Sequence, residues 1–163
     1  MRKFTLLIII LWSTHVTVVS QSCLPDGITF TNQAAIDNFQ TNFPDCNEIE
    51  GNVLIEGTSI NNLNGLSVLA SIGGDLVISG NDSLTSLSGI DNLASIGGNL
   101  NIAYNALTNI EGLDNLISIG GDLIIARNNA LTSLSGINNL ASIGGDLDIT
   151  WNDALTSITG LGK

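Results

Sequence analysis

Three side chains of the kind that dominate binding surfaces recur at nearly constant spacing in the second half of the chain. They are Tyr104, Arg127 and Trp151, with sequence offsets of 23 and 24 between neighbours. Tyr, Arg and Trp are the residue types most enriched where truncation abolishes binding. If each occupies the same place in a repeated unit, the three form one column, with Asp148 and Thr150 beside it. The pattern predicts a binding site on an exposed strand face, or a strand-end position that simply tolerates large side chains.

Two carboxylates, Asp122 and Asp146, also recur at an offset of 24 and could support hydrolysis. In adjacent repeats they would lie about 5 Å apart, the separation that a retaining glycosidase requires. Duplication of any acidic residue produces such a pair, so a structural role is the favoured interpretation. Calcium binding that adds Asp75 is a third interpretation, but the glycine-aspartate nonapeptide of calcium-binding β-rolls is absent from the sequence. We therefore expect a protein that is not an enzyme and has no cofactor or metal.

Composition excludes further classes of function. The 163-residue chain has 4 Lys and Arg against 15 Asp and Glu, a formal net charge of −11. It therefore lacks the cationic surface that nucleic-acid binding requires. The one histidine, His15, lies in a segment that we expect to be removed. Its loss would take away Ser-His and Cys-His catalysis as well as imidazole metal sites.

Residues 1–20 have the layout of a secretory signal peptide. Positive charge at Arg2 and Lys3 precedes an apolar run over residues 4–12, which is too short to span a bilayer. Val18 and Ser20 favour cleavage after Ser20. We expect residues 1–20 to be removed and the mature protein to be secreted or at the cell surface, without a membrane span. An uncleaved N-terminal anchor is the alternative.

Both cysteines, Cys23 and Cys46, lie in the expected mature chain. An exported chain with two cysteines allows one intramolecular disulfide. In the chain-entropy model, closing this loop stabilises the fold by about 3 kcal/mol. Two free thiols are the alternative, which an oxidising compartment disfavours. We therefore expect a Cys23–Cys46 bond.

The spacing of the candidate site comes from an internal repeat. Five apolar-x-apolar triplets follow one another at offsets of 23, 24, 23 and 24. They begin at Val53, Leu76, Leu100, Leu123 and Leu147. The alternation inside each triplet is that of a strand, and one unit cannot bury its own apolar side. The repeat predicts an all-β solenoid of stacked coils over residues 53–163, with the outer residues of each triplet pointing inward.

Asparagine recurs five residues after the start of each later triplet. These residues are Asn81, Asn105, Asn128 and Asn152, with Thr58 at the same spacing in the earliest coil. Amide side chains stacked inside a turn can satisfy backbone groups that no strand partner reaches. We interpret the column as a structural ladder.

Residues 21–52 have a different pattern from the repeats. Thr31 can cap a helix and Pro44 can end it. One face of this helix comprises Ala35, Ile36, Phe39 and Phe43. We expect a helical N-terminal cap over the first coil. The disulfide would tie it to the stack, because Cys46 stands where later coils have leucine.

The opening of the repeats resembles a receptor L domain, the leucine-rich module of insulin and epidermal-growth-factor receptors. The resemblance rests on Cys46-Asn47-Glu48-Ile49-Glu50-Gly51-Asn52-Val53-Leu54-Ile55, preceded by Cys23, and on the recurring Leu-x-x-Ile-Gly-Gly-x-Leu-x-Ile. It covers residues 23 to 161. It implies a right-handed β-helix with a disulfide-tied cap, used in extracellular binding or adhesion. The receptors' cysteine-rich modules and kinase have no counterpart in these residues, so hormone reception is not implied.

We therefore favour a binding or adhesion module that recognises an extracellular glycan or protein through its exposed strand face. The alternatives are a β-helix enzyme acting on polysaccharides and a purely structural spacer. The sequence stops at Leu161-Gly162-Lys163, inside a coil. We expect either a longer protein or another covering for that end of the stack.

Overall fold

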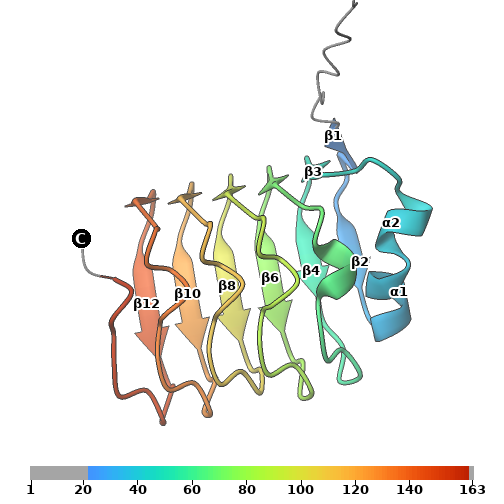
Figure 1. Ribbon diagram of the computed structural model, residues 1–163. Coiled ribbons are helices and arrows are strands. Elements are labelled where there is room, and N and C mark those ends of the chain that lie inside the picture. Colours follow the sequence, from blue (N-terminus) through green and yellow to red (C-terminus); the bar gives the residue numbers. More distant parts are fainter. Residues whose placement is uncertain (1–21, 162–163) are drawn as a thin grey trace, which may run out of the picture.

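Two parallel sheets wind into one solenoid of about five turns in the computed structural model, which describes residues 22–161 (Figure 1). The longer strands form one sheet: β2 (Ile28–Phe30), β4 (Val53–Ile55), β6 (Leu76–Ser79), β8 (Leu100–Ala103), β10 (Leu123–Ala126) and β12 (Leu147–Thr150). Two-residue strands form the other: β1 (Ser22–Cys23), β3 (Glu48–Ile49), β5 (Ser71–Ile72), β7 (Ser95–Ile96), β9 (Ser118–Ile119) and β11 (Ser142–Ile143). The expected all-β solenoid is confirmed.

Each strand pairs in register with its equivalent in the next coil, so the repeat in the sequence becomes columns in space. In β6 and β8, Leu76 lies opposite Leu100 and Ile78 opposite Ile102. Because side chains alternate along a strand, these residues point inward and are fully or almost fully buried. Leucine and isoleucine columns from every side of the coil then merge into one continuous core. The last coil packs on one side only, and Leu147 remains 48% exposed.

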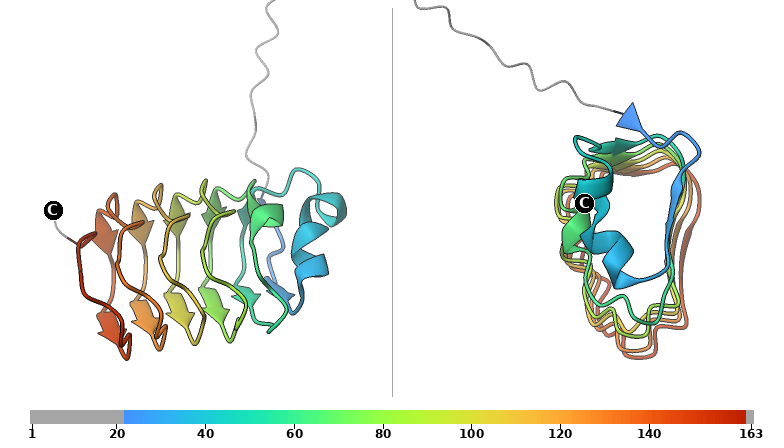
Figure 2. Two further views of the ribbon diagram at one scale, coloured as in Figure 1. Left: turned by 60° about the horizontal axis from the view of Figure 1, so that its bottom comes forward. Right: turned by 90° about the vertical axis from the view of Figure 1, so that its right-hand side faces the viewer.

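Two short helices lie across the opening of the first coil, as the view along the stack shows (Figure 2). They are α1 (Gln33–Asp37) and α2 (Phe39–Asn42). Ile36 and Phe39 are fully buried, and the Phe39 ring meets the Phe30 ring edge-on at 5.8 Å between centroids. The helices therefore cover apolar side chains that no preceding coil covers. A single turn of 3-10 helix, η1 (Asn64–Leu66), packs beside them.

The predicted helix cap at Thr31 is wrong by one residue. The backbone is still extended at Asn32, whose side-chain oxygen accepts a hydrogen bond from the Ala35 N–H at 3.0 Å. The helix also divides at Asn38, where the side-chain amide donates to the Ala34 carbonyl at 2.8 Å. Both differences arise because Asn side chains compete with the helix for backbone partners.

The cap region is continuous with the solenoid. We expected the coils to begin at Val53, but β1 and β2 already extend both sheets by pairing with β3 and β4. The Cys23–Cys46 disulfide is present, with the two Cα atoms 5.7 Å apart. Cys46 is buried where later coils have leucine. The bond therefore fastens the first strand to the turn that follows the helices.

The predicted signal peptide, residues 1–20, lies outside the described residues. Within residues 22–161, no helix has the length and apolar character needed to cross a membrane.

Replacing Gly112 with alanine should destabilise the stack far more than the same change at Gly80. Gly112 has φ +109°, and a Cβ there would collide with the backbone of Leu87 in the preceding coil. We expect Gly112→Ala to cost about 3 kcal/mol or more in urea unfolding. Gly80 has φ +67° with open space around a Cβ, so Gly80→Ala should cost about 1 kcal/mol. Equal losses of unfolding free energy in the two variants would contradict the close approach of the coils at Gly112.

Candidate binding surface

Tyr104, Arg127 and Trp151 share an unusual backbone conformation. Each immediately follows the longer strand of its coil, with φ of 57°, 56° and 56°. This left-handed region costs a residue with a Cβ roughly 1–2 kcal/mol and is uncommon for bulky side chains. Gly80 occupies the equivalent place one coil earlier with φ +67°. Local backbone preference therefore favours glycine at these positions and does not account for three large side chains.

The three side chains stack on one another. The Arg127 guanidinium carbon lies 5.4 Å from the centroid of the Tyr104 ring and 5.1 Å from that of the Trp151 ring. Each ring thus offers one face to the cation, whose attraction to the π electrons orders all three groups. Tyr104 is 58% exposed and Trp151 is 65% exposed. We call these three residues the Tyr-Arg-Trp column.

Arg127 is the only Lys or Arg in residues 22–161. Within that part of the chain, its guanidinium contacts the two rings and forms no ion pair. A guanidinium between two rings keeps its N–H groups directed outward around its edge. The column therefore presents hydrogen-bond donors between two apolar surfaces.

The two other predicted site residues lie in β12, the strand that ends directly before Trp151. Asp148 and Thr150 are exposed in β12, opposite Ile124 and Ala126 of β10. The Thr150 carbonyl accepts the Arg127 backbone N–H at 3.1 Å. The sheet thus fixes the Arg127 backbone, and Thr150 leads directly into Trp151.

A shallow hollow of about 380 Å³ adjoins the column. Tyr104 and Arg127 line it together with Asp82, Asn105, Ala106, Asn129 and Ala130. Asp82 is exposed and was not singled out from the sequence. The signal was available, since Asp82 and Asp153 both directly follow an asparagine of the predicted ladder.

The ladder asparagines lie inside the turn that carries the column. Asn105 Oδ1 accepts the Asn81 backbone N–H at 3.2 Å and its side-chain Nδ2–H at 2.9 Å. Asn128 holds Asn105 in the same way, and Asn152 accepts the Asn128 backbone N–H. Thr58 does not join them. The N–H of Gly57 donates to Asn81 Oδ1 instead.

A second ladder accounts for the carboxylates considered for catalysis or calcium binding. Its members are Asn52, Asp75, Asn99, Asp122 and Asp146, which we call the Asx column. One side-chain oxygen of each of the first four accepts the backbone N–H of the next member at 2.7–2.8 Å. Asp122 and Asp146 are thus joined through a backbone N–H. Among residues 22–161, no group of three or more His, Cys, Asp and Glu side chains could hold a metal ion.

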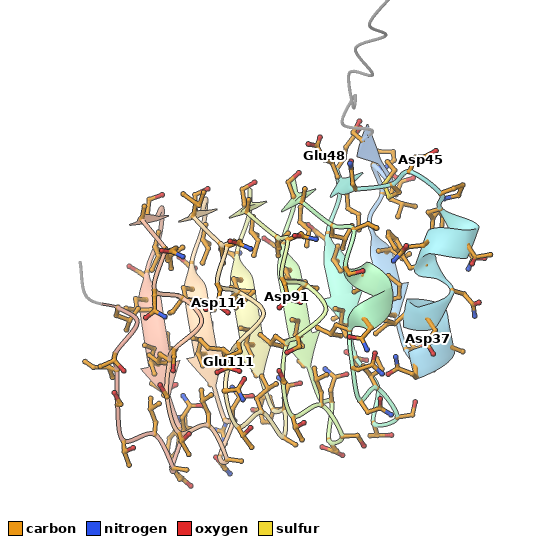
Figure 3. All side chains as sticks on the ribbon, viewed as in Figure 1. Asp37, Asp45, Glu48, Asp91, Glu111 and Asp114 are labelled. Atoms are coloured by element: carbon orange, nitrogen blue, oxygen red, sulfur yellow. A yellow bond between two sulfur atoms is a disulfide. The ribbon has the colours of Figure 1, made fainter. Side chains whose placement is uncertain are left out.

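Other acidic side chains lie around the helical cap and on a third side of the stack. Figure 3 marks Asp91 and Asp114 in adjacent coils, with Glu111 nearby. Asp91 and Asp114 accept backbone N–H groups from Gly89 and Gly112 at 2.7 and 3.3 Å. These two carboxylates therefore shape their own turns.

The fold and the exposed column together define a parallel β-solenoid that presents ordered side chains on rigid strand ends. Residues 45–109 match the family model of the receptor L domain, and the solenoid is consistent with an L-domain fold. The likeness to this family suggests an extracellular ligand-binding module, and together with the disulfide it points to an extracellular or cell-surface protein. No curated protein and no solved structure matches the chain significantly.

Proposed function

We propose that the protein is a non-catalytic binding or adhesion module that recognises an extracellular glycan or protein through the Tyr-Arg-Trp column and the adjacent end of β12. The observation that carries the proposal is the backbone of the column. Three bulky residues adopt positive φ in successive coils, and strain of this kind concentrates at functional sites. A spacer would gain stability from glycine at the same positions.

Preorganisation supports binding at this surface. The rings and the guanidinium are already stacked, and they stand at the ends of paired strands. Little side-chain entropy would therefore be lost when a partner binds. Large aromatic and Arg side chains held in this way are typical of the residues that supply most of the affinity in protein interfaces.

A non-catalytic role is supported by what the candidate carboxylates do. Asp122 uses one oxygen to hold the next coil, so it is part of the scaffold. The same contact recurs along the Asx column from Asn52 onward. An amide at Asn52 and Asn99 serves as well as a carboxylate at Asp75, which fits a hydrogen-bond acceptor better than a general acid or nucleophile.

The double variant Tyr104→Ala/Trp151→Ala should lose binding while the protein remains folded. Arrays of extracellular proteins and of glycans, probed with wild type and variant, provide the measurement. We expect at least a tenfold loss for any genuine partner, about 1.4 kcal/mol or more. Circular dichroism establishes that the variant is folded.

Val68→Ala/Ile117→Ala is the matched control. Both residues are exposed large apolar side chains, at 38% and 54%, outside the column and the hollow beside it. This control should bind as wild type does. If the two double variants bind all partners equally well, the large side chains of the column are only tolerated at these positions and have no role in binding. The proposal then fails.

A further inference from the structure

The Tyr-Arg-Trp column has a vacant position at its N-terminal end. Ser79 pairs with Ala103 across β6 and β8, so Gly80 lies beside Tyr104. Its N–H donates to the Ala103 carbonyl at 3.3 Å. Apart from Gly80 itself and its two chain neighbours, no heavy atom lies within 4 Å of the place where a Cβ of Gly80 would stand. A side chain here would continue the stack, and the chain supplies none.

The Tyr104 side chain is 58% exposed, so much of its ring is not covered by Arg127. The guanidinium of Arg127, from the following coil, covers one face at 5.4 Å. Because Gly80 belongs to the preceding coil and Arg127 to the following one, we infer that the other face of the ring adjoins the space above Gly80. In the same column, the Trp151 ring already stacks on a guanidinium, that of Arg127, at 5.1 Å. An aromatic ring at this place in the fold therefore accommodates an arginine side chain.

Charge at the vacant position favours a cation. Asp82, two residues after Gly80, lines the hollow that Tyr104 and Arg127 also line. Within residues 22–161 it forms no ion pair, with Arg127 or otherwise. Arg127 is the one cationic side chain in that part of the chain, and the whole chain carries −11. The field around the molecule therefore attracts positive groups. An aromatic ring and an unpaired carboxylate that line one hollow suit a planar guanidinium, which can stack on one and hydrogen-bond to the other.

We propose that an arginine side chain of a basic protein partner occupies the space above Gly80, stacking on Tyr104 and pairing with Asp82. This inference rests on the proposed function and specifies its partner: a protein segment whose guanidinium extends the existing sequence of ring, guanidinium and ring by one member. The Arg127 guanidinium lies on the far side of the Tyr104 ring, so the two cations are separated by the ring and each has its own aromatic face.

The test is a titration of ¹⁵N-labelled protein with the capped peptide acetyl-Gly-Arg-Gly-amide, followed by NMR. The comparison probe is the same peptide with citrulline, which has nearly the same shape and no charge. We expect the arginine peptide to shift the amide signals of Gly80, Asp82 and Tyr104. The citrulline peptide should bind at least about fivefold more weakly.

Asp82→Asn and Asp153→Asn form a matched pair of variants. Both residues are exposed and directly follow a ladder asparagine, and each variant removes one negative charge. Asp82→Asn should weaken the arginine peptide at least about fivefold, whereas Asp153→Asn, in the coil of Trp151, should change it by less than about twofold. Gly80→Leu fills the space and should also prevent binding. If the Gly80→Leu variant does not fold, the Asp82→Asn variant still tests the inference.

Several results would overturn the inference. Equal weakening by Asp82→Asn and Asp153→Asn would mean that general attraction to an acidic protein explains the binding. Equal binding of the citrulline peptide, or shifts away from Gly80, would exclude a guanidinium site. A neutral oligosaccharide that shifts the same amides while the arginine peptide does not would assign the space to a sugar. If a partner from the arrays depends on Tyr104 and Trp151 but not on Asp82, the proposed function stands and this inference alone fails.

Discussion

Leu100→Asp should unfold the central coils, with a loss of about 4–5 kcal/mol or more in urea unfolding. Leu100 is fully buried at the start of β8, between Leu76 and Leu123 of the neighbouring coils. A carboxylate at this place would be surrounded by leucine and isoleucine with no cation within reach. Because every coil stabilises the next, the damage should extend to β6 and β10 and reduce the β signal in circular dichroism.

Ile117→Asp is the control for Leu100→Asp. Ile117 is 54% exposed, so the same carboxylate would stand in water, and we expect a change within about 0.5 kcal/mol. Asn101 is less suitable although it points outward from β8. Its side-chain Oδ1 is buried without a hydrogen-bond partner among the described residues. Comparable losses for the Leu100 and Ile117 variants would contradict the assignment of Leu100 to the core and of Ile117 to the surface.

Asn128→Ala should destabilise the protein by about 3 kcal/mol or more. The Asn128 side chain donates to the carbonyls of Ile102 and Ala126 and accepts from the backbone and side chain of Asn105. Alanine would leave the buried Asn105 backbone N–H without its acceptor, at a cost of about 1–3 kcal/mol, and would remove three further hydrogen bonds worth about 1 kcal/mol each. The Ala126 carbonyl would keep the Tyr104 N–H as a donor. Thermal and urea unfolding measure the loss.

The neighbouring residue provides the comparison. Asn129 is exposed, and Asn129→Ala should change the free energy of unfolding by less than about 0.5 kcal/mol. Identical side chains, one position apart, then differ only in direction. If Asn129→Ala costs as much as Asn128→Ala, the ladder is not what stabilises this turn.

Much of the fold could be predicted because the repeat converts sequence spacing into spatial position. The alternation of Leu100 and Ile102 determines which side of β8 faces inward, and the nearly constant coil length brings Leu76 and Leu123 to either side. Prediction fails where a shift of one residue along the chain, or one competing side chain, determines which residue makes a contact. In the first coil Gly57, one residue before Thr58, donates to the ladder, and Asn32 replaces Thr31 as the helix cap.

The candidate site could be predicted only as a column of residues. Spacing placed Tyr104, Arg127 and Trp151 together, but stacking depends on side-chain conformation and on a left-handed backbone that spacing does not specify. The vacancy at Gly80 was missed for a similar reason, since a glycine in a repeat normally indicates a turn or a close approach. The role of Asp75 and its equivalents was also missed, although a carboxylate or amide follows the glycines of each coil.

The two ladders run in opposite directions along the stack. In the asparagine ladder the N–H of an earlier coil donates to a side chain of the later coil, as from Asn105 to Asn128. In the Asx column a later N–H donates to an earlier side chain, as from Asp122 to Asn99. Each coil therefore offers both a hydrogen-bond donor and an acceptor to each neighbouring coil. Copying the two-coil unit that starts at Leu84 and restarts at Leu131 would give every new coil partners above and below. Gene duplication could then lengthen the molecule by about 10 Å at a time, so its reach can evolve separately from the chemistry it displays.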